Sequence, residues 1–159
     1  MQFMPDGEPV LLDAGALIGA LLRGDIRHTE ARPLVEAARR GVLLACTTVG
    51  ILSEVYAALT WINATPPQTP DDAAEAVRLL VAPPSAMRIL HTDDRAVNLM
   101  LDLAAKHKLT ARRVHDARHA ATALAAGVTK VYTYDVGDWQ VFAKDGIQVI
   151  GPPSVVILG

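Results

Sequence analysis

The chain has very little cysteine and no long apolar run. Its 159 residues include one cysteine, Cys46, within the apolar run 42–46. A disulfide framework is therefore excluded, and we expect a reducing compartment with Cys46 packed in the interior. Hydrophobic residues make up 51% of the chain, yet they nowhere form the ~18 uninterrupted apolar residues that a membrane span needs. Residues 1–9 carry two acids and no base, unlike a targeting signal, so we expect a cytoplasmic protein with no membrane contact.

An excess of positive charge is also missing. Fifteen lysines and arginines stand against 17 aspartates and glutamates, which gives a formal net charge of -2. Affinity for nucleic-acid phosphates comes from clustered Lys and Arg, so any such contact must be local. The candidate clusters are Arg23 with Arg27, Arg39 with Arg40, and Arg112 with Arg113 and Arg118. Each is more commonly a solvated helix face.

The sequence does contain short apolar runs that alternate with amphipathic stretches. The predicted strands are residues 9–13, 42–46, 87–91, 130–134, 148–150 and, more weakly, 155–158. The predicted helices are residues 14–22, 28–40 with Gly41 as a cap, from caps at Thr47 or Thr48 to about 63, 71–81, 93–108 and 114–126. This alternation implies βαβ units and a mainly parallel sheet, which is an α/β fold. The proline-rich breaks are too short to divide the chain, so we expect one domain, 1–159.

Four acidic residues stand where this alternation brings its elements to one edge of the sheet. In a parallel sheet with right-handed crossovers, the carboxyl ends of the strands and the amino ends of the following helices share an edge, and ligands bind there. Asp13 ends the first strand, and Asp135 follows the strand 130–134. Glu54 lies about two turns into the helix after the second strand, and Asp116 opens a late helix. We therefore expect all four side chains at the same edge.

Glu54 is the most informative of these acids, because it is the only charged residue or histidine between Val49 and Leu59. At ~100° per residue, the predicted helix is nearly apolar all round. An unpaired carboxylate on such a helix would cost several kcal/mol or shift its pKa, so a bound cation is a reasonable expectation. An arginine partner or simple exposure explains Glu54 equally well.

Each of the other acids also has an ordinary explanation when taken alone. Asp116 suits the first turn of any helix, where the macrodipole favours an acid. Asp13, and also Asp135 with Asp138, are typical turn residues. Their convergence supports the prediction, because crowded carboxylates repel one another unless a hard divalent cation neutralises them. Oxygen ligands favour Mg²⁺ or Mn²⁺ over zinc, and such ions support hydrolysis of a nucleic-acid backbone.

Four motifs surround these acids in a fixed order. They are V-L-L-D-A-G-A-L-I around Asp13, T-T-V-G-I-L-S-E-V around Glu54, V-H-D-A-R-H-A-A-T-A-L-A-A-G around Asp116, and V-Y-T-Y-D-V-G-D-W around Asp135 and Asp138. Over almost the whole chain they resemble PIN domains, and among these the VapC-type toxins of bacterial toxin–antitoxin pairs. The resemblance implies a three-layer α/β/α sandwich around a mainly parallel sheet. It also implies an endoribonuclease whose metal, Mg²⁺ or Mn²⁺, is bound by Asp13, Glu54, Asp116 and a fourth acid. The fourth acid is Asp135 or Asp138, and Asp135 is ranked first.

The same resemblance implies further roles and partners. Thr133 would help to position water at the metal, although it is equally a typical strand residue. The side chains near Asp116 that could contact RNA are Arg112, Arg113, Arg118, His115 and His119. Implied partners are a second copy of the chain and a VapB-type antitoxin. The C-terminal segment of the antitoxin would lie in an apolar groove near the first helices and block the acidic site. The chain departs from many relatives at Gly15, where they have Ser, Thr or Asn, so a backbone group or water must replace that contact.

Other functions are also compatible with parts of the sequence. His115 and His119 would share a helix face as in H-E-x-x-H zinc hydrolases, but no obvious third ligand follows. A haloacid-dehalogenase-like phosphatase needs a second acid two residues after the first, where Gly15 stands, and is excluded. Two alternatives within the PIN resemblance stay open. One is a housekeeping RNA-processing nuclease without an antitoxin, and the other is a non-catalytic scaffold that binds RNA or protein.

Overall fold

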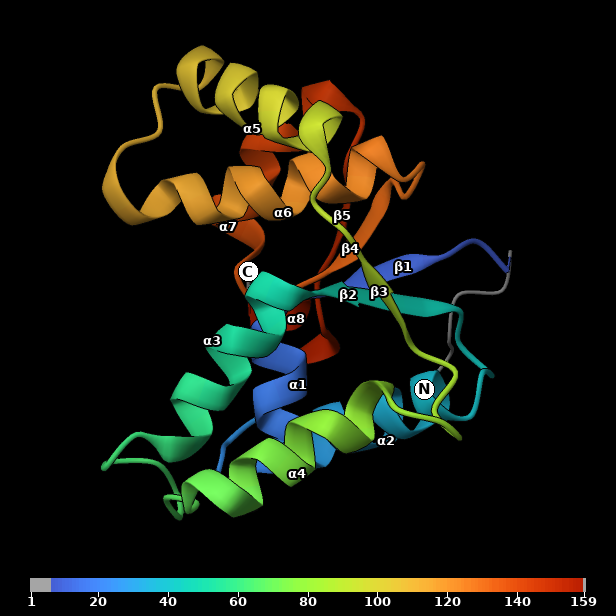
Figure 1. Ribbon diagram of the computed structural model, residues 1–159, viewed down its shortest axis with the longest axis vertical. Coiled ribbons are helices and arrows are strands. Elements are labelled where there is room, and N and C mark those ends of the chain that lie inside the picture. Colours follow the sequence, from blue (N-terminus) through green and yellow to red (C-terminus); the bar gives the residue numbers. More distant parts are fainter. Residues whose placement is uncertain (1–6, 159) are drawn as a thin grey trace.

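The computed structural model describes residues 7–158, in which a five-stranded sheet lies between two layers of helices (Figure 1). The expectation that residues 1–9 carry no targeting signal falls largely outside the described residues. The strands are β1 (Val10–Leu12), β2 (Ala45–Thr48), β3 (Arg88–Leu90), β4 (Lys130–Tyr132) and β5 (Gln148–Ile150). Their spatial order is β3-β2-β1-β4-β5, and every pairing is parallel.

Helices cover both faces of this sheet. They are α1 (Ala14–Leu21), α2 (His28–Arg39), α3 (Val49–Thr60), α4 (Pro70–Val81), α5 (Asp94–Lys106), α6 (Val114–Ala125), α7 (Val136–Trp139) and α8 (Pro153–Leu158), with 3₁₀ helices η1 (Ala111–Arg113) and η2 (Gln140–Asp145). In Figure 1, α1 to α4 lie on one side of the sheet, and α5 and α6 lie on the other. The predicted α/β/α sandwich around a parallel sheet is confirmed.

The central strand β1 positions the rest of the molecule. All three of its residues are buried, as expected for a strand covered by helices on both faces. From β1 the chain builds β2 and β3 on one side, and then crosses over to place β4 and β5 on the other side. Because crossovers keep one hand, this reversal puts the later helices on the opposite face. The carboxyl ends of β1 and β4 therefore flank a topological switch point, where such sheets bind ligands.

The second strand begins later than its composition predicts. The apolar run 42–46 predicts a strand there, but β2 spans Ala45–Thr48. Residues 42–44, three of the five in that run, lie in the loop after α2, where Val42 and Leu44 are 64% and 50% exposed. The predicted cap is nevertheless present, because the Thr48 Oγ1 accepts the Ile51 N–H at 3.1 Å. Thr48 thus ends β2 and begins α3.

The prediction of a strand over 155–158 is wrong, since this segment belongs to helix α8. Its β-branched composition favours a strand, but Pro153 occupies the first helical position, for which its fixed φ is suited. The carboxylate of Glu30 on α2 accepts hydrogen bonds from the Ser154 N–H at 3.0 Å and the Ser154 hydroxyl at 2.7 Å. A residue distant in sequence therefore caps this helix.

Two expectations from composition can be compared directly with the structure. Cys46 is fully buried and free, and burial raises the pKa of its thiol to about 11, so it packs as a small apolar group. Between residues 7 and 158, every helix is too short or too polar to cross a membrane.

Candidate active site

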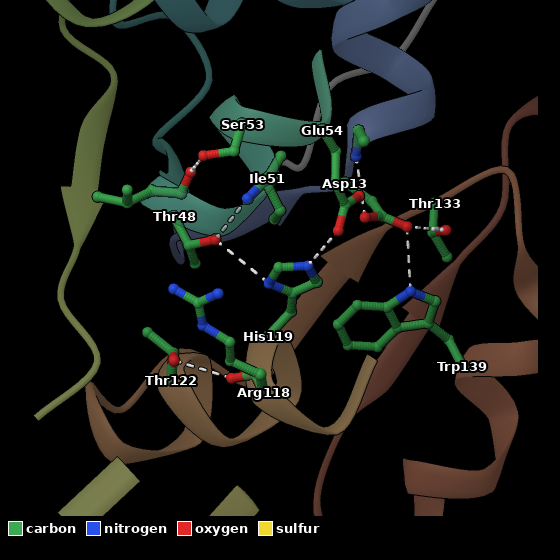
Figure 2. Close-up of polar contacts among 12 residues, drawn as sticks. Asp13, Thr48, Ile51, Ser53, Glu54, Arg118, His119, Thr122, Thr133 and Trp139 are labelled. Carbon is green, nitrogen blue, oxygen red and sulfur yellow. Dashed lines mark hydrogen bonds and ion pairs between the residues drawn. The ribbon is translucent and has the colours of Figure 1, made fainter. Parts of the chain in front are cut away.

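Asp13 is held in one orientation at the switch point between β1 and β4. It is the N-cap of α1, and its Oδ1 accepts the Ala14 N–H at 2.9 Å. Its Oδ2 accepts the Thr133 hydroxyl at 2.8 Å and the Trp139 indole N–H at 3.1 Å (Figure 2). A carboxylate has about four acceptor positions, so three donors fix its rotation and leave little freedom. Asp13 therefore presents its remaining lone-pair position in a defined direction.

Thr133 and Trp139 attach the end of β4 to this carboxylate. The Thr133 Oγ1 also accepts the Asp135 N–H at 2.9 Å, so one hydroxyl links two of the predicted site acids. Trp139 is completely buried at the end of α7 and packs edge to face against Phe142, with ring centroids 5.8 Å apart. The predicted role of Thr133 toward water stays a prediction. Trp139 has no role predicted from the sequence, where its only signal is its place in the motif that carries Asp135 and Asp138.

Glu54 has a histidine as its partner. Its side chain is 44% exposed, and its Oε1 lies 2.9 Å from Nε2 of His119, which is 2% exposed. The other ring nitrogen of His119 lies 3.3 Å from the Thr48 hydroxyl. The expected alternatives for Glu54, a cation, an arginine or simple exposure, did not include this contact. His119 itself faces inward (Figure 2), so the structure gives no support to the prediction that it contacts RNA.

The remaining acids reveal their proximity through their pKa values. Burial raises the pKa of Asp116, and the charges of Asp13 and Asp138 raise it further. Burial also raises the pKa of Asp135, with contributions from Asp13, Asp138 and Glu54 in the same direction. Since such effects weaken with distance, Asp116 and Asp135 each lie within electrostatic reach of Asp13 and Asp138, and Glu54 lies within reach of Asp135. The structure thus brings the predicted acids to one edge of the sheet.

Arg27 is a positive counterpart to these acids. Its guanidinium lies over the Tyr134 ring, 5.5 Å from the centroid, and pairs with the Asp25 carboxylate at 2.8 Å. It also counteracts the rise in the pKa of Asp135. A Cβ on Gly15 would lie 2.9 Å from Arg27 Nη1, so the glycine that departs from many relatives makes room for this side chain. From the sequence, Arg27 is predicted only as part of a candidate basic cluster with Arg23.

The other predicted RNA contacts gather at the start of α6. Arg112 and His115 are exposed. The Arg113 Nε lies 3.5 Å from Asp116 Oδ2, and its Nη2 donates to the Asp138 carbonyl at 3.4 Å. Arg118 is half-buried beside the first turn of α3, where a Cβ on Gly50 would lie 3.1 Å from its Nη1. These side chains form a local basic rim next to Asp116.

The acid set can be compared with the needs of a metal ion. Among residues 7–158, no three His, Cys, Asp or Glu side chains lie close enough together to hold one between them. This gives no support to zinc, and His115 and His119 face different surroundings. The donor chemistry fits a hard divalent cation, because all the candidates are carboxylates and neighbouring charges raise two of their pKa values. Mg²⁺ usually takes only one or two carboxylates and keeps several waters, so it does not require a group of three.

Comparison with known proteins identifies the family. The PIN domain family matches residues 10–143. This match spans most of the 159 residues, so the chain belongs to the PIN domain family. None of the curated proteins matches it.

Solved structures with this fold come from toxin–antitoxin systems. VapC20 of Mycobacterium tuberculosis, a toxin that cleaves the sarcin-ricin loop, is 19% identical, with a TM-score of 0.66 over 90% of this chain and 99% of that one. A toxin–antitoxin complex from Klebsiella pneumoniae contains a chain that is 20% identical, with a TM-score of 0.58 over 89% and 95%. A chain of VapBC-1 from nontypeable Haemophilus influenzae is 16% identical, with a TM-score of 0.60 over 90% of this chain and 97% of that one. At these identities the likeness shows that the fold is the one found in VapC toxins.

Proposed function

We propose that this chain is a Mg²⁺- or Mn²⁺-dependent endoribonuclease and the toxin of a type II toxin–antitoxin pair. The observation that supports this most strongly is the electrostatic coupling of five carboxyl groups at the switch point of a PIN fold. Burial and repulsion from neighbouring carboxylates raise the pKa values of Asp116 and Asp135, so the charges of these two acids are unfavourable for the protein alone. A site that concentrates such charge is suited to a divalent cation and an anionic substrate bridged by it.

Each group would have a distinct task. Asp13, Glu54, Asp116 and Asp135, with Asp138 as the alternative to Asp135, would hold the cation, one or two of them directly and the others through its water ligands. When bound, the cation would neutralise these acids and polarise a phosphodiester for attack by water. Thr133 and Trp139 keep Asp13 in place through its Oδ2. The basic rim of Arg112, Arg113, Arg118 and His115 would bind phosphates on either side of the cleaved bond.

An antitoxin and a second copy of the chain are the proposed protein partners, in the cytoplasm. The similarity to VapC toxins supports the antitoxin, and a pocket of about 370 Å³ between α1, α2 and α4 fits the implied groove. Apolar side chains such as Leu21, Val35 and Leu79 line this pocket together with the charged side chains of Arg23, Arg32, Glu36 and Arg39. Val97 and Leu101, one turn apart on α5, are 40% and 55% exposed and support an apolar contact between copies. Light scattering after size exclusion would show a mass twice that of the chain.

The nuclease is tested by incubating total RNA with the protein and Mg²⁺ or Mn²⁺. We expect Asp13→Asn and Asp116→Asn to lose at least 100-fold in cleavage rate, as removal of a key electrostatic group does in other enzymes. Asp102→Asn, an exposed site on α5, is the matched control and should cut normally. Undiminished cutting by both site variants would refute the assignment. RNA binding without any cutting by the unaltered protein would favour the non-catalytic scaffold.

The antitoxin has a separate test, because a housekeeping nuclease would show the same cleavage. A small upstream reading frame that encodes a DNA-binding protein would support the toxin. Co-expression of that protein should then abolish cleavage. Lack of such a neighbour would favour the housekeeping nuclease.

A further inference from the structure

We propose that His119 is a positioning residue that holds the Glu54 carboxylate in the orientation needed at the metal site. This inference rests on the proposed function. His119 Nε2 lies 2.9 Å from Glu54 Oε1, and among residues 7–158 this is the only polar contact of the Glu54 side chain. Glu54 is 44% exposed whereas His119 is 2% exposed, so a fixed buried group holds a group that is otherwise free to turn into solvent.

The hydrogen-bond pattern assigns the ring its orientation. An ionised carboxylate only accepts hydrogen bonds, so Nε2 carries the ring hydrogen toward Glu54 at 2.9 Å, and the Thr48 hydroxyl, which also accepts the Ile51 N–H at 3.1 Å, donates to Nδ1 at 3.3 Å. In a neutral imidazole one nitrogen carries hydrogen while the other accepts, so Nδ1 is the acceptor in this ring. The donors run in one direction from the backbone of α3, through Thr48 and His119, to Glu54.

Close packing also fixes the ring. A Cβ on Gly50 would lie 2.9 Å from His119 Cε1, so the ring rests against the first turn of α3 at a point where only glycine leaves room. His119 also stands three residues after Asp116 on α6, and residues at this spacing share a helix face. Helix α6 therefore contributes one acid directly and orients a second acid from another helix.

This contact has the form of an outer-shell bond to a metal ligand. Such partners hold the orientation of the ligand, and their loss typically costs about 10–100-fold in metal affinity or activity. The alternative is a purely structural histidine, whose loss would lower stability without a specific effect on the metal.

Two substitutions of similar size separate these roles. His119→Gln can place an amide N–H near the position of Nε2 and so keep the contact with Glu54. His119→Asn can keep the contact with Thr48 but does not reach Glu54. Titration calorimetry with Mn²⁺ alone, below the unfolding temperature, should show a 10–100-fold weaker affinity for His119→Asn and recovery of most of it for His119→Gln. In the Glu54→Gln background, His119→Asn should have little further effect.

A second histidine provides the matched control. His107 Nε2 lies 2.6 Å from the Asp145 carboxylate, between the end of α5 and the turn before β5, at the opposite edge of the sheet. His107→Asn should therefore lower stability and leave Mn²⁺ affinity unchanged. The inference would be overturned if His119→Asn and His119→Gln lost Mn²⁺ affinity equally, or if His119→Asn lost none. Asp13→Asn would still abolish Mn²⁺ binding in that case, so the proposed metal site would stand. If the unaltered protein itself binds no Mn²⁺ and cuts no RNA, the proposed function fails, and the inference fails with it.

Discussion

Replacing Trp139 by phenylalanine removes one hydrogen-bond donor from Asp13 and keeps most of the buried ring. The indole N–H lies 3.1 Å from Asp13 Oδ2, and the whole Trp139 side chain is buried. A hydrogen bond to a charged group contributes about 1.5–3 kcal/mol to stability. The smaller ring adds a loss of about 1 kcal/mol, a fraction of the cost of a full truncation to alanine. We expect Trp139→Phe to destabilise the protein by about 2.5–4 kcal/mol.

Urea unfolding followed by far-ultraviolet circular dichroism in EDTA measures this loss. For a chain of this size, 1 kcal/mol shifts the melting temperature by roughly 2–4 °C, so Tm should fall by about 5–15 °C. The same substitution in the Asp13→Asn background should cost only about 1 kcal/mol, since the charge-assisted bond is already gone. Equal costs in the two backgrounds, within about 0.5 kcal/mol, would show that the indole acts through packing alone and would refute the reasoning.

Two further predictions concern charge. The pKa of Asp116 is raised, first by burial and then by the charges of Asp13 and Asp138. The favourable contribution of Asp116 to stability is therefore present below its ordinary pKa and is lost as pH rises through the higher folded value. Without metal at pH 7, Asp116→Asn should stabilise the protein by about 0.5–2 kcal/mol in urea unfolding, and this gain should vanish at pH 3. Burial raises the pKa of Asp145, but hydrogen bonds from Lys106 and His107 outweigh it and leave the pKa lowered. The stabilisation by Asp145 is therefore present above the ordinary pKa and lost as pH falls through the lower folded value, so the stability cost of Asp145→Asn should shrink between pH 6 and pH 2; a cost that stays constant over this range would contradict the assignment.

The order of strands and helices could be predicted because it depends on local patterns. Apolar runs and caps locate β1, β4 and the helices α1 and α6 to within a few residues. The limits of β2 and the nature of residues 153–158 could not be predicted in this way. The first depends on which apolar residues find a buried place, and the second depends on Glu30, which lies 124 residues before Ser154.

In the candidate site, too, local patterns predict which residues come together but not the contacts between residues far apart in sequence. The rule that strands and following helices share an edge brings Asp13, Glu54 and Asp116 together without any knowledge of contacts. The contacts themselves join residues far apart in sequence, such as Trp139 with Asp13 at a separation of 126 and His119 with Glu54 at 65. Neither pairing has a local signal, because an indole or a histidine in an apolar stretch is equally suited to an ordinary core position.

Asp13 is also the first residue that helix α1 needs, since its Oδ1 caps the Ala14 N–H. Asparagine is an equally good cap, whereas alanine at a cap position costs about 1 kcal/mol. Substitution of Asp13 by asparagine and by alanine therefore has different effects on the stability of α1. Asp13→Asn would give a chain that is silent toward RNA but retains the start of its first helix. That variant is the suitable bait for capturing uncut RNA or isolating the chain with its partner.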